Sequence, residues 1–140
     1  MIYLLAALGG ALGALARWAQ SEALPHSPGA WPWATLLVNL LGCLLIGILL
    51  AVLLARFPDS PWLRPFLAVG VLGGFTTYST FAVDVVRLGD AGHGALAAGY
   101  VLISVLGGVT AVLAGLLAAR AVIHAVESLD DDLRAGEGST

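Results

Sequence analysis

Four long apolar runs constrain the fold of this chain more than any other feature. They cover residues 2–19, 33–55, 62–88 and 95–123. A helix crosses a hydrocarbon core of about 30 Å with about 20 residues, so each run is long enough to span a membrane. Only six basic and nine acidic side chains occur among 140 residues, whereas charged residues make up about a quarter of a soluble domain. The sequence therefore predicts an all-α membrane protein with four transmembrane helices.

The acidic residues are concentrated at the end of the chain. Five of the nine lie after residue 126, so the net charge of −3 describes the tail and the rest of the chain is nearly neutral. We expect one four-helix transmembrane domain over residues 1–126 and an acidic, disordered tail over residues 127–140. No basic stripe is present to face phosphates, which argues against nucleic-acid binding. A single cysteine and three scattered histidines provide neither a disulfide framework nor a metal cluster of such side chains.

The arginines indicate how the chain inserts into a membrane. If the four runs cross alternately, the face with both termini carries four arginines and the opposite face two: Arg56, Arg64, Arg120 and Arg134 against Arg17 and Arg87. An excess of arginine normally marks the cytoplasmic side. A bias this small is compatible with cytoplasmic termini, and equally with a chain that inserts in both directions and pairs antiparallel.

The first span contains a face of small residues that ends in a charge. Gly9, Gly13 and Arg17 are each four residues apart and therefore share one side of the helix. The two glycines form a GxxxG pattern that lets another helix approach closely. Arg17 either extends to the membrane interface or points toward a packed or water-filled interior.

The second span contains one amide in otherwise apolar surroundings. Asn39 shares a face with Thr35 and Gly42. Its two N–H donors and its carbonyl acceptor must all be satisfied inside a membrane. Taken alone, Asn39 is most simply explained by an interhelical hydrogen bond, and the alternative is a donor to a transported ion.

The third span contains the least helix-like stretch, residues 73–81, in which two glycines precede several Thr and Ser residues. Such residues are poor helix formers, so we expect a helix break. Non-helical backbone at membrane depth marks a site because it is tolerated only inside protein or beside a wet cavity. The alternative is that the hydroxyls bond back to their own helix. Beyond this stretch, Asp84 and Arg87 are spaced to form a local pair.

The fourth span contains a polar track. Tyr100 and Ser104 are four residues apart, and small residues continue nearly the same face. The track is compatible with helix packing, and equally with the lining of a path for a ligand.

Three runs in this order resemble the signatures of one family, the Fluc/CrcB fluoride channels. They are residues 9–14 leading to Arg17, residues 35–42 around Asn39, and residues 73–81 followed by Asp84. The four-span layout is also similar, so the resemblance covers residues 1 to about 124. Tyr78 stands where the family usually has Phe, Asp84 where Glu is common, and Gly108 and Val112 where some members continue the hydroxyl track.

The resemblance implies a passive channel through which fluoride leaves the cytoplasm. In this family two dual-topology subunits form an antiparallel homodimer with a broken third helix and two narrow pores. The expected location is the inner membrane of a bacterial or archaeal cell, where the chain crosses the lipid bilayer several times. The expected partners are fluoride, lipid and a second copy of the chain, and an enzymatic activity is not expected.

The resemblance also implies roles for individual residues. The family's fluoride pore corresponds to Asn39, Tyr78, Phe81, Ser104, Tyr100, Thr77 and Arg17. Within this set the Asn39 amide donates to fluoride, and the rings of Tyr78 and Phe81 present their edges to it. The backbone carbonyls of Gly73 and Thr76 correspond to those that hold a structural sodium ion at the dimer centre.

The main alternative is a dual-topology exporter of small molecules driven by protons. Such a transporter needs a carboxylate within the membrane. The first, second and fourth runs contain no Asp or Glu, and Asp84 lies near the end of the third. An enzyme is disfavoured because the runs contain no carboxylate cluster, histidine pair or activated nucleophile. A purely structural packing subunit remains a third interpretation.

Overall fold

The computed structural model describes residues 1–24 and 30–137 of the chain. In this part the chain is all-helical, with α1 over Ile2–Ala23, α2 over Trp33–Arg56, a π-helical segment η1 over Arg64–Leu72, α3 over Gly73–Phe75, α4 over Tyr78–Asp90 and α5 over Gly94–Glu137. Four helical stretches are long and apolar enough to cross a membrane: Ile2–Ala23, Trp33–Arg56, Arg64–Asp90 and Gly94–Asp130. The prediction of an all-α protein with four membrane spans is confirmed.

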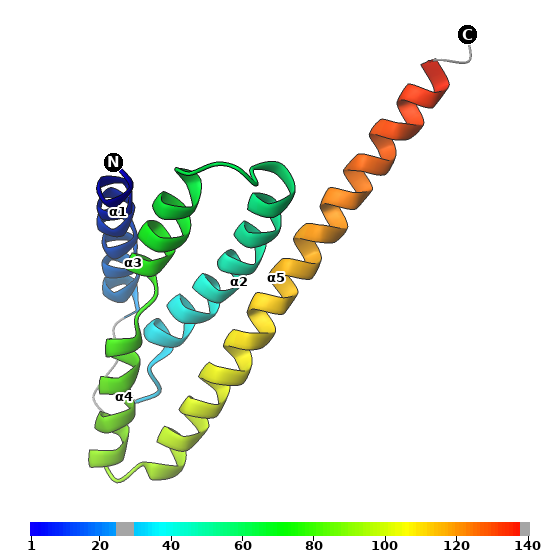
Figure 1. Cartoon of the computed structure of the whole chain (residues 1–140). Coiled ribbons are helices and arrows are strands. Elements are labelled where there is room, and N and C mark those ends of the chain that lie inside the picture. Colours follow the sequence, from blue (N-terminus) through cyan, green and yellow to red (C-terminus); the bar gives the residue numbers. More distant parts are fainter. Residues whose placement is uncertain (25–29, 138–140) are drawn as a thin grey trace.

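The helices form two closely packed pairs, which Figure 1 shows side by side. In the first pair, α1 packs along η1 and α3, and in the second, α2 packs along α5. Helix α4 follows α3 and contacts α5. Both ends of the chain lie toward the same end of the molecule, as an even number of spans requires.

Backbone contact, made possible by glycine, holds α1 against η1 and α3. A Cβ atom added at Gly9 would meet the Phe66 carbonyl oxygen, and one added at Gly13 would meet that of Val71. From the other side, a Cβ atom at Gly74 would meet the backbone of Gly10. The predicted close approach at Gly9 and Gly13 is confirmed, and the helix that approaches is the third span of the same chain.

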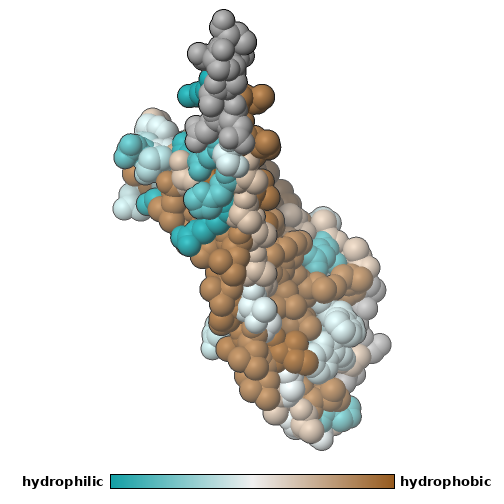
Figure 2. All heavy atoms as spheres, turned by 90° about the vertical axis from the view of Figure 1, so that its right-hand side faces the viewer, coloured by the Kyte–Doolittle hydropathy of each residue, from teal (hydrophilic) through white to brown (hydrophobic). Residues whose placement is uncertain are grey.

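The apolar surface of the molecule faces outward. Leu12, Leu106 and Leu117 are each more than half exposed, and a broad hydrophobic surface is visible in Figure 2. The buried core is small by comparison and is centred on Leu88 and Tyr100. Because such an exterior is stable only in hydrocarbon, the chain is a multi-pass membrane protein.

Helix α5 continues to Glu137, whereas a disordered tail was expected from residue 127. Residues 138–140 of that tail lie outside the described part of the chain. Within the extension, Arg134 pairs with Asp130 at 2.9 Å, one helical turn away, which favours the helix. The extension reaches past the other helices in Figure 1.

Candidate functional site

The chain between α3 and α4 is extended for two residues. Thr76 has φ −77° and ψ 157°, and Thr77 has φ −145° and ψ 116°. Thr77 thus directs its backbone N–H and C=O toward a side chain of another helix. Asn39 of α2 meets both groups: its Oδ1 accepts from the Thr77 N–H at 2.8 Å, and its Nδ2 donates to the Thr77 carbonyl at 3.0 Å. Asn39 therefore makes the interhelical hydrogen bonds that its position in a span favours, and these use one of its two N–H donors.

The hydroxyls around the extended residues satisfy further backbone groups. The Thr77 hydroxyl accepts from the Thr80 N–H at 3.1 Å, which makes Thr77 the N-cap of α4. It also donates to the Thr80 hydroxyl at 2.9 Å. Thr76 donates to the Leu72 carbonyl at 2.9 Å at the end of the preceding segment. The alternative that the hydroxyls bond back to their own helix is thus confirmed for Thr76, whereas the Thr77 hydroxyl caps the helix that follows it.

A groove of about 320 Å³ lies beside this extended segment. It is lined by Asn39, Thr76, Thr77, Tyr78, Phe81, Ser104 and Val105. Five of the seven residues predicted for a pore therefore lie around one space, although they come from α2, α4, α5 and the connection before α4. The walls combine an amide, hydroxyls and aromatic rings without a charged side chain.

An aromatic series extends from this groove into the core. The ring centroids of Tyr78 and Phe81 are 6.0 Å apart, and those of Phe81 and Tyr100 are 5.3 Å apart. Tyr100 is fully buried and packs edge-on against Trp31 at 5.7 Å. Tyr100 is thus placed behind the groove and contacts Phe81, a ring of its wall. The sequence did not indicate that Trp31 belongs to this series.

Two hydroxyls of the predicted polar track are buried in an unusual way. Among the described residues, neither the Tyr100 hydroxyl nor the Ser104 hydroxyl makes a hydrogen bond of regular geometry, although the Tyr100 hydroxyl interacts with the hydroxyls of Thr35 and Ser104. Native proteins nearly always satisfy such atoms. Ser104 also lines the groove, with its hydroxyl oxygen buried in the wall.

Asp84 is buried against α2. It is 3% exposed, and its Oδ2 accepts a hydrogen bond of 2.7 Å from the hydroxyl of Thr35. Thr35 is itself 5% exposed. The sequence suggested only the local partner Arg87, which is exposed. Because Thr35 is 49 residues away, no local pattern could have revealed this contact.

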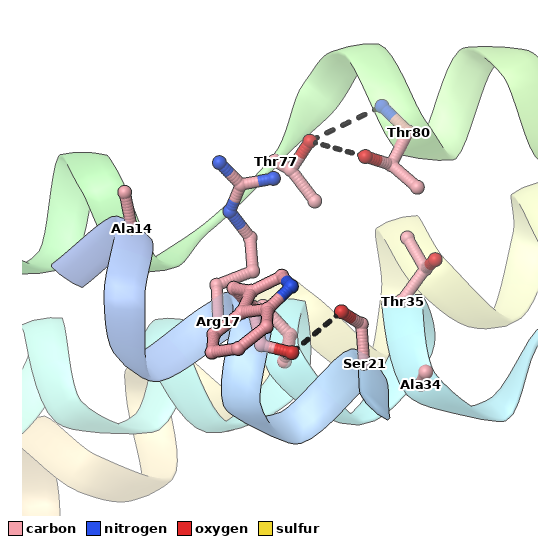
Figure 3. Close-up of a pocket in the computed structure, with 9 residues that line it drawn as sticks. Ala14, Arg17, Ser21, Ala34, Thr35, Thr77 and Thr80 are labelled. Carbon is pink, nitrogen blue, oxygen red and sulfur yellow. Dashed lines mark hydrogen bonds between the residues drawn. The ribbon is translucent and has the colours of Figure 1, made fainter. Parts of the chain in front are cut away.

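Arg17 lines a second space, a pocket of about 310 Å³ between α1, α2 and α4. Its Nε donates to the Gly74 carbonyl at 3.2 Å, and Figure 3 shows the guanidinium extending toward Thr77. Thr77 lines both this pocket and the groove. Arg17 therefore points to the interior rather than along the outer surface, and its charge lies next to the extended segment.

These features define a small four-span membrane protein with a polar, aromatic-lined groove beside two extended residues between α3 and α4. The sequence model of the family described as "CrcB-like protein, Camphor Resistance (CrcB)" matches residues 4–116, and the chain belongs to this family. It is 47% identical over 121 residues to the fluoride-specific ion channel FluC of Bordetella petrii, covering 86% of this chain and 92% of that protein.

Two further relatives carry similar names. The FluC of Paracoccus denitrificans is 46% identical over 118 residues, covering 84% of this chain and 94% of that protein. For the fluoride-specific ion channel FluC 2 of Streptomyces avermitilis the identity is 47% over 94 residues, or 67% of this chain, and the match spans 60% of that relative. Since these are ion channels, the prediction that the chain is not an enzyme is confirmed.

Proposed function

We propose that this protein is a fluoride-selective channel that lets fluoride flow passively out of the cytoplasm. The observation that carries the proposal is the groove, which brings Asn39, Tyr78, Phe81 and Ser104 together in a chain whose relatives are named for fluoride conduction. Fluoride holds its water tightly, so a pore must replace that hydration with other donors. The second N–H of Asn39, the hydroxyl of Ser104 and the positive ring edges are such donors.

The proposed channel is an antiparallel homodimer with two pores. Support comes from the exposure of groove residues in the single chain: Tyr78 is 82% exposed although it lines the groove. If a second copy packed against this face, it would cover the exposed Tyr78 ring and form a second wall of the groove. The nearly balanced arginines allow the two copies to insert in opposite directions.

The dimer centre is proposed to hold a structural sodium ion on the backbone carbonyls of Gly73 and Thr76. Two carbonyl oxygens are too few for a hard cation, which takes about six oxygen ligands in the cases of calcium and magnesium. Gly73 is exposed in the single chain, so the same two carbonyls of a second copy would raise the number of oxygen ligands to four. Bound there, the ion would join the two third spans. The proposed location is the inner membrane of a bacterial or archaeal cell.

A second candidate function is proton-coupled export of small molecules. The buried position of Asp84 favours it more than the sequence did, because a carboxylate within a membrane span is a typical proton carrier. Its short hydrogen bond to Thr35 weighs against this role, because the carboxyl group is held between α4 and α2 as a packing contact.

Fluoride efflux from liposomes containing the pure protein tests the proposed function. We expect rapid fluoride efflux, little chloride efflux under the same gradient, and no dependence of the rate on a proton gradient. Efflux that requires a proton gradient would support the exporter. A folded protein that moves no fluoride would contradict the proposal.

Cross-linking tests the proposed dimer. A single cysteine at Thr76, in a background where Cys43 is replaced by Ser, is expected to give disulfide-linked dimers. Failure to cross-link from every position between Gly73 and Thr77, in protein that still conducts fluoride, would contradict an interface at the third spans.

A further inference from the structure

A crevice opens between α2 and α5 beyond the point where these helices touch. At the contact, a Cβ atom on Gly47 would meet the Val112 carbonyl, and one on Gly115 would meet the Leu44 carbonyl. The two backbones are therefore in direct contact there. Further along, the helices enclose a pocket of about 350 Å³ lined by Ala51, Leu54, Ala55, Arg120, Ile123, His124 and Glu127. The crevice is therefore wedge-shaped, because α2 and α5 separate beyond their contact at Gly47 and Gly115.

The crevice has one apolar wall and one charged rim. Ala51, Leu54 and Ala55 of α2 form the apolar wall, and the charged side chains come mainly from α5. Glu127 has two basic neighbours at long range: Arg56 Nη2 is 3.9 Å from its Oε1, and His124 Nδ1 is 3.7 Å from its Oε2. Exposed pairs at such distances are weak. Glu127 is therefore shared between Arg56 and His124 and is held firmly by neither.

Arg120 adds a further positive charge to this rim. Among the described residues it has no ion-pair partner within 4 Å, and it lines the crevice beside the apolar residues. Two arginines, Arg56 and Arg120, thus lie around one carboxylate, Glu127, which also contacts His124. The rim therefore carries more positive than negative charge and can bind an anion. Arg120 is the arginine of the rim that has no ion-pair partner among the described residues.

The position of the crevice in the membrane indicates which anion is available. Helix α2 ends at Arg56, and an arginine at the end of a span lies at the boundary between lipid and water. Figure 2 shows hydrophilic residues gathered toward this end of the molecule above a broad hydrophobic surface. At this level a phospholipid supplies both an apolar chain and a phosphate. Basic pockets between transmembrane helices are a known form of site for such head groups.

We propose that the crevice between α2 and α5 binds the phosphate of an anionic phospholipid, with Arg120 as the main contact and Arg56 beside it. One acyl chain lies along the wall formed by Ala51, Leu54 and Ala55. Free phosphate shares the anionic chemistry but has no apolar part to fill this wall. The site is independent of fluoride conduction, because no residue of the crevice lines the groove.

Native mass spectrometry of the full-length protein in detergent measures the binding directly. Three probes are added in turn: phosphatidylglycerol, phosphatidylcholine with the same chains, and inorganic phosphate. We expect phosphatidylglycerol to bind best, because the choline of phosphatidylcholine places a positive charge beside the arginines. Equal binding of both lipids, or displacement of phosphatidylglycerol by an equal concentration of inorganic phosphate, would overturn the proposal.

Three variants locate the binding. Arg120→Gln is expected to weaken phosphatidylglycerol binding roughly fivefold. Arg134→Gln is the matched control, since it removes the same charge from α5 but Arg134 pairs with Asp130 outside the crevice. Ala55→Trp keeps every charge and fills the apolar wall, so it should also weaken lipid binding. Parent-like binding by Arg120→Gln or by Ala55→Trp, or equal losses in Arg120→Gln and Arg134→Gln, would overturn the proposal.

Discussion

The seam between α1 and the third span differs from the groove in the kind of atoms that meet. At the seam, Gly9, Gly13 and Gly74 bring backbone against backbone, with no room for a Cβ atom. At the groove, an amide, hydroxyls and rings meet around an open space. Close packing is the main source of helix association in lipid. The seam therefore positions the extended segment, while the groove keeps an Asn39 N–H donor beyond the one that the fold uses.

One polar side chain from each region holds the short segment that lies between the seam and the groove. Arg17 reaches from α1 to the Gly74 carbonyl, and Asn39 reaches from α2 to both backbone groups of Thr77. Gly74 and Thr77 are three residues apart, so both side chains fix the same short segment. Mutations at the seam are therefore expected to affect folding, and mutations at the groove to affect conduction.

The largest effect is expected at the seam. Gly13→Leu places a side chain where the Val71 carbonyl already lies, so we expect no folded protein after purification. The matched control is Gly10→Ala on the same helix, because a Cβ atom at Gly10 has nothing within 4 Å. That change should be tolerated and should stabilise the helix by up to ~1 kcal/mol. Size-exclusion chromatography of both variants is the measurement. A well-folded Gly13→Leu protein would contradict the claim that folding depends on backbone contact at the seam.

The second prediction concerns Asn39→Asp, which separates a pore donor from a packing amide. A carboxylate repels fluoride and loses the donor to the Thr77 carbonyl, so flux is expected to collapse. If Asn39 served packing only, the cost would be about 0.6 to 2 kcal/mol of stability with near-normal flux per folded dimer. Size-exclusion behaviour and fluoride efflux are measured on the same preparation. Full flux from a well-folded dimer would remove Asn39 from the pore.

The third prediction tests whether the ring edges matter. Phe81→Ile keeps an apolar side chain but removes the electropositive edge, so fluoride flux should fall sharply while the protein still folds. Tyr78→Phe is the control, since it keeps the ring and should conduct like the parent. Efflux from liposomes is the measurement. Unchanged flux in Phe81→Ile would show that the rings serve packing alone.

The smallest effect is expected behind the groove. Thr35→Val removes the hydrogen bond to Asp84 and should lower the stability of the folded protein by about 0.6 to 2 kcal/mol. Thr110→Val is matched, because the exposed Thr110 hydroxyl bonds only to the Leu106 carbonyl of its own helix. Thermal unfolding in detergent compares the two. Equal melting temperatures would mean that the Thr35 contact adds nothing to stability.

The sequence predicted the parts of this protein that depend on local pattern. The apolar runs gave the four spans, and the spacing of Gly9 and Gly13 gave a close-packed face. Glycines followed by hydroxyl residues predicted a broken third helix; the structure has two extended residues, Thr76 and Thr77, between α3 and α4, and the break of the third span stays a prediction. Each of these signals lies within a few residues of the feature that it predicts.

Contacts between distant segments could not be predicted in the same way. The partner of Asn39 is 38 residues away and that of Asp84 is 49 residues away. Which faces meet depends on the packing of whole helices. One missed feature did have a local signal: Thr is a preferred N-cap residue, and Thr77 stands directly before the first residue of α4. The roles of the groove residues in conduction stay predictions.

The contact of Trp31 with Tyr100 has a spectroscopic consequence. Trp31 Nε1 is buried without a hydrogen-bond partner among the described residues, whereas Trp18 and Trp33 are more than half exposed. Because Trp18 and Trp33 lie toward the ends of α1 and α2, where indole rings meet the water at the membrane interface, Trp31 should emit at shorter wavelength than those two. Through Tyr100 and Phe81 its ring connects to Tyr78 in the groove wall. Movement of those rings when an ion binds is expected to change the emission of Trp31, which gives the protein an intrinsic fluorescent reporter at the far end of the series.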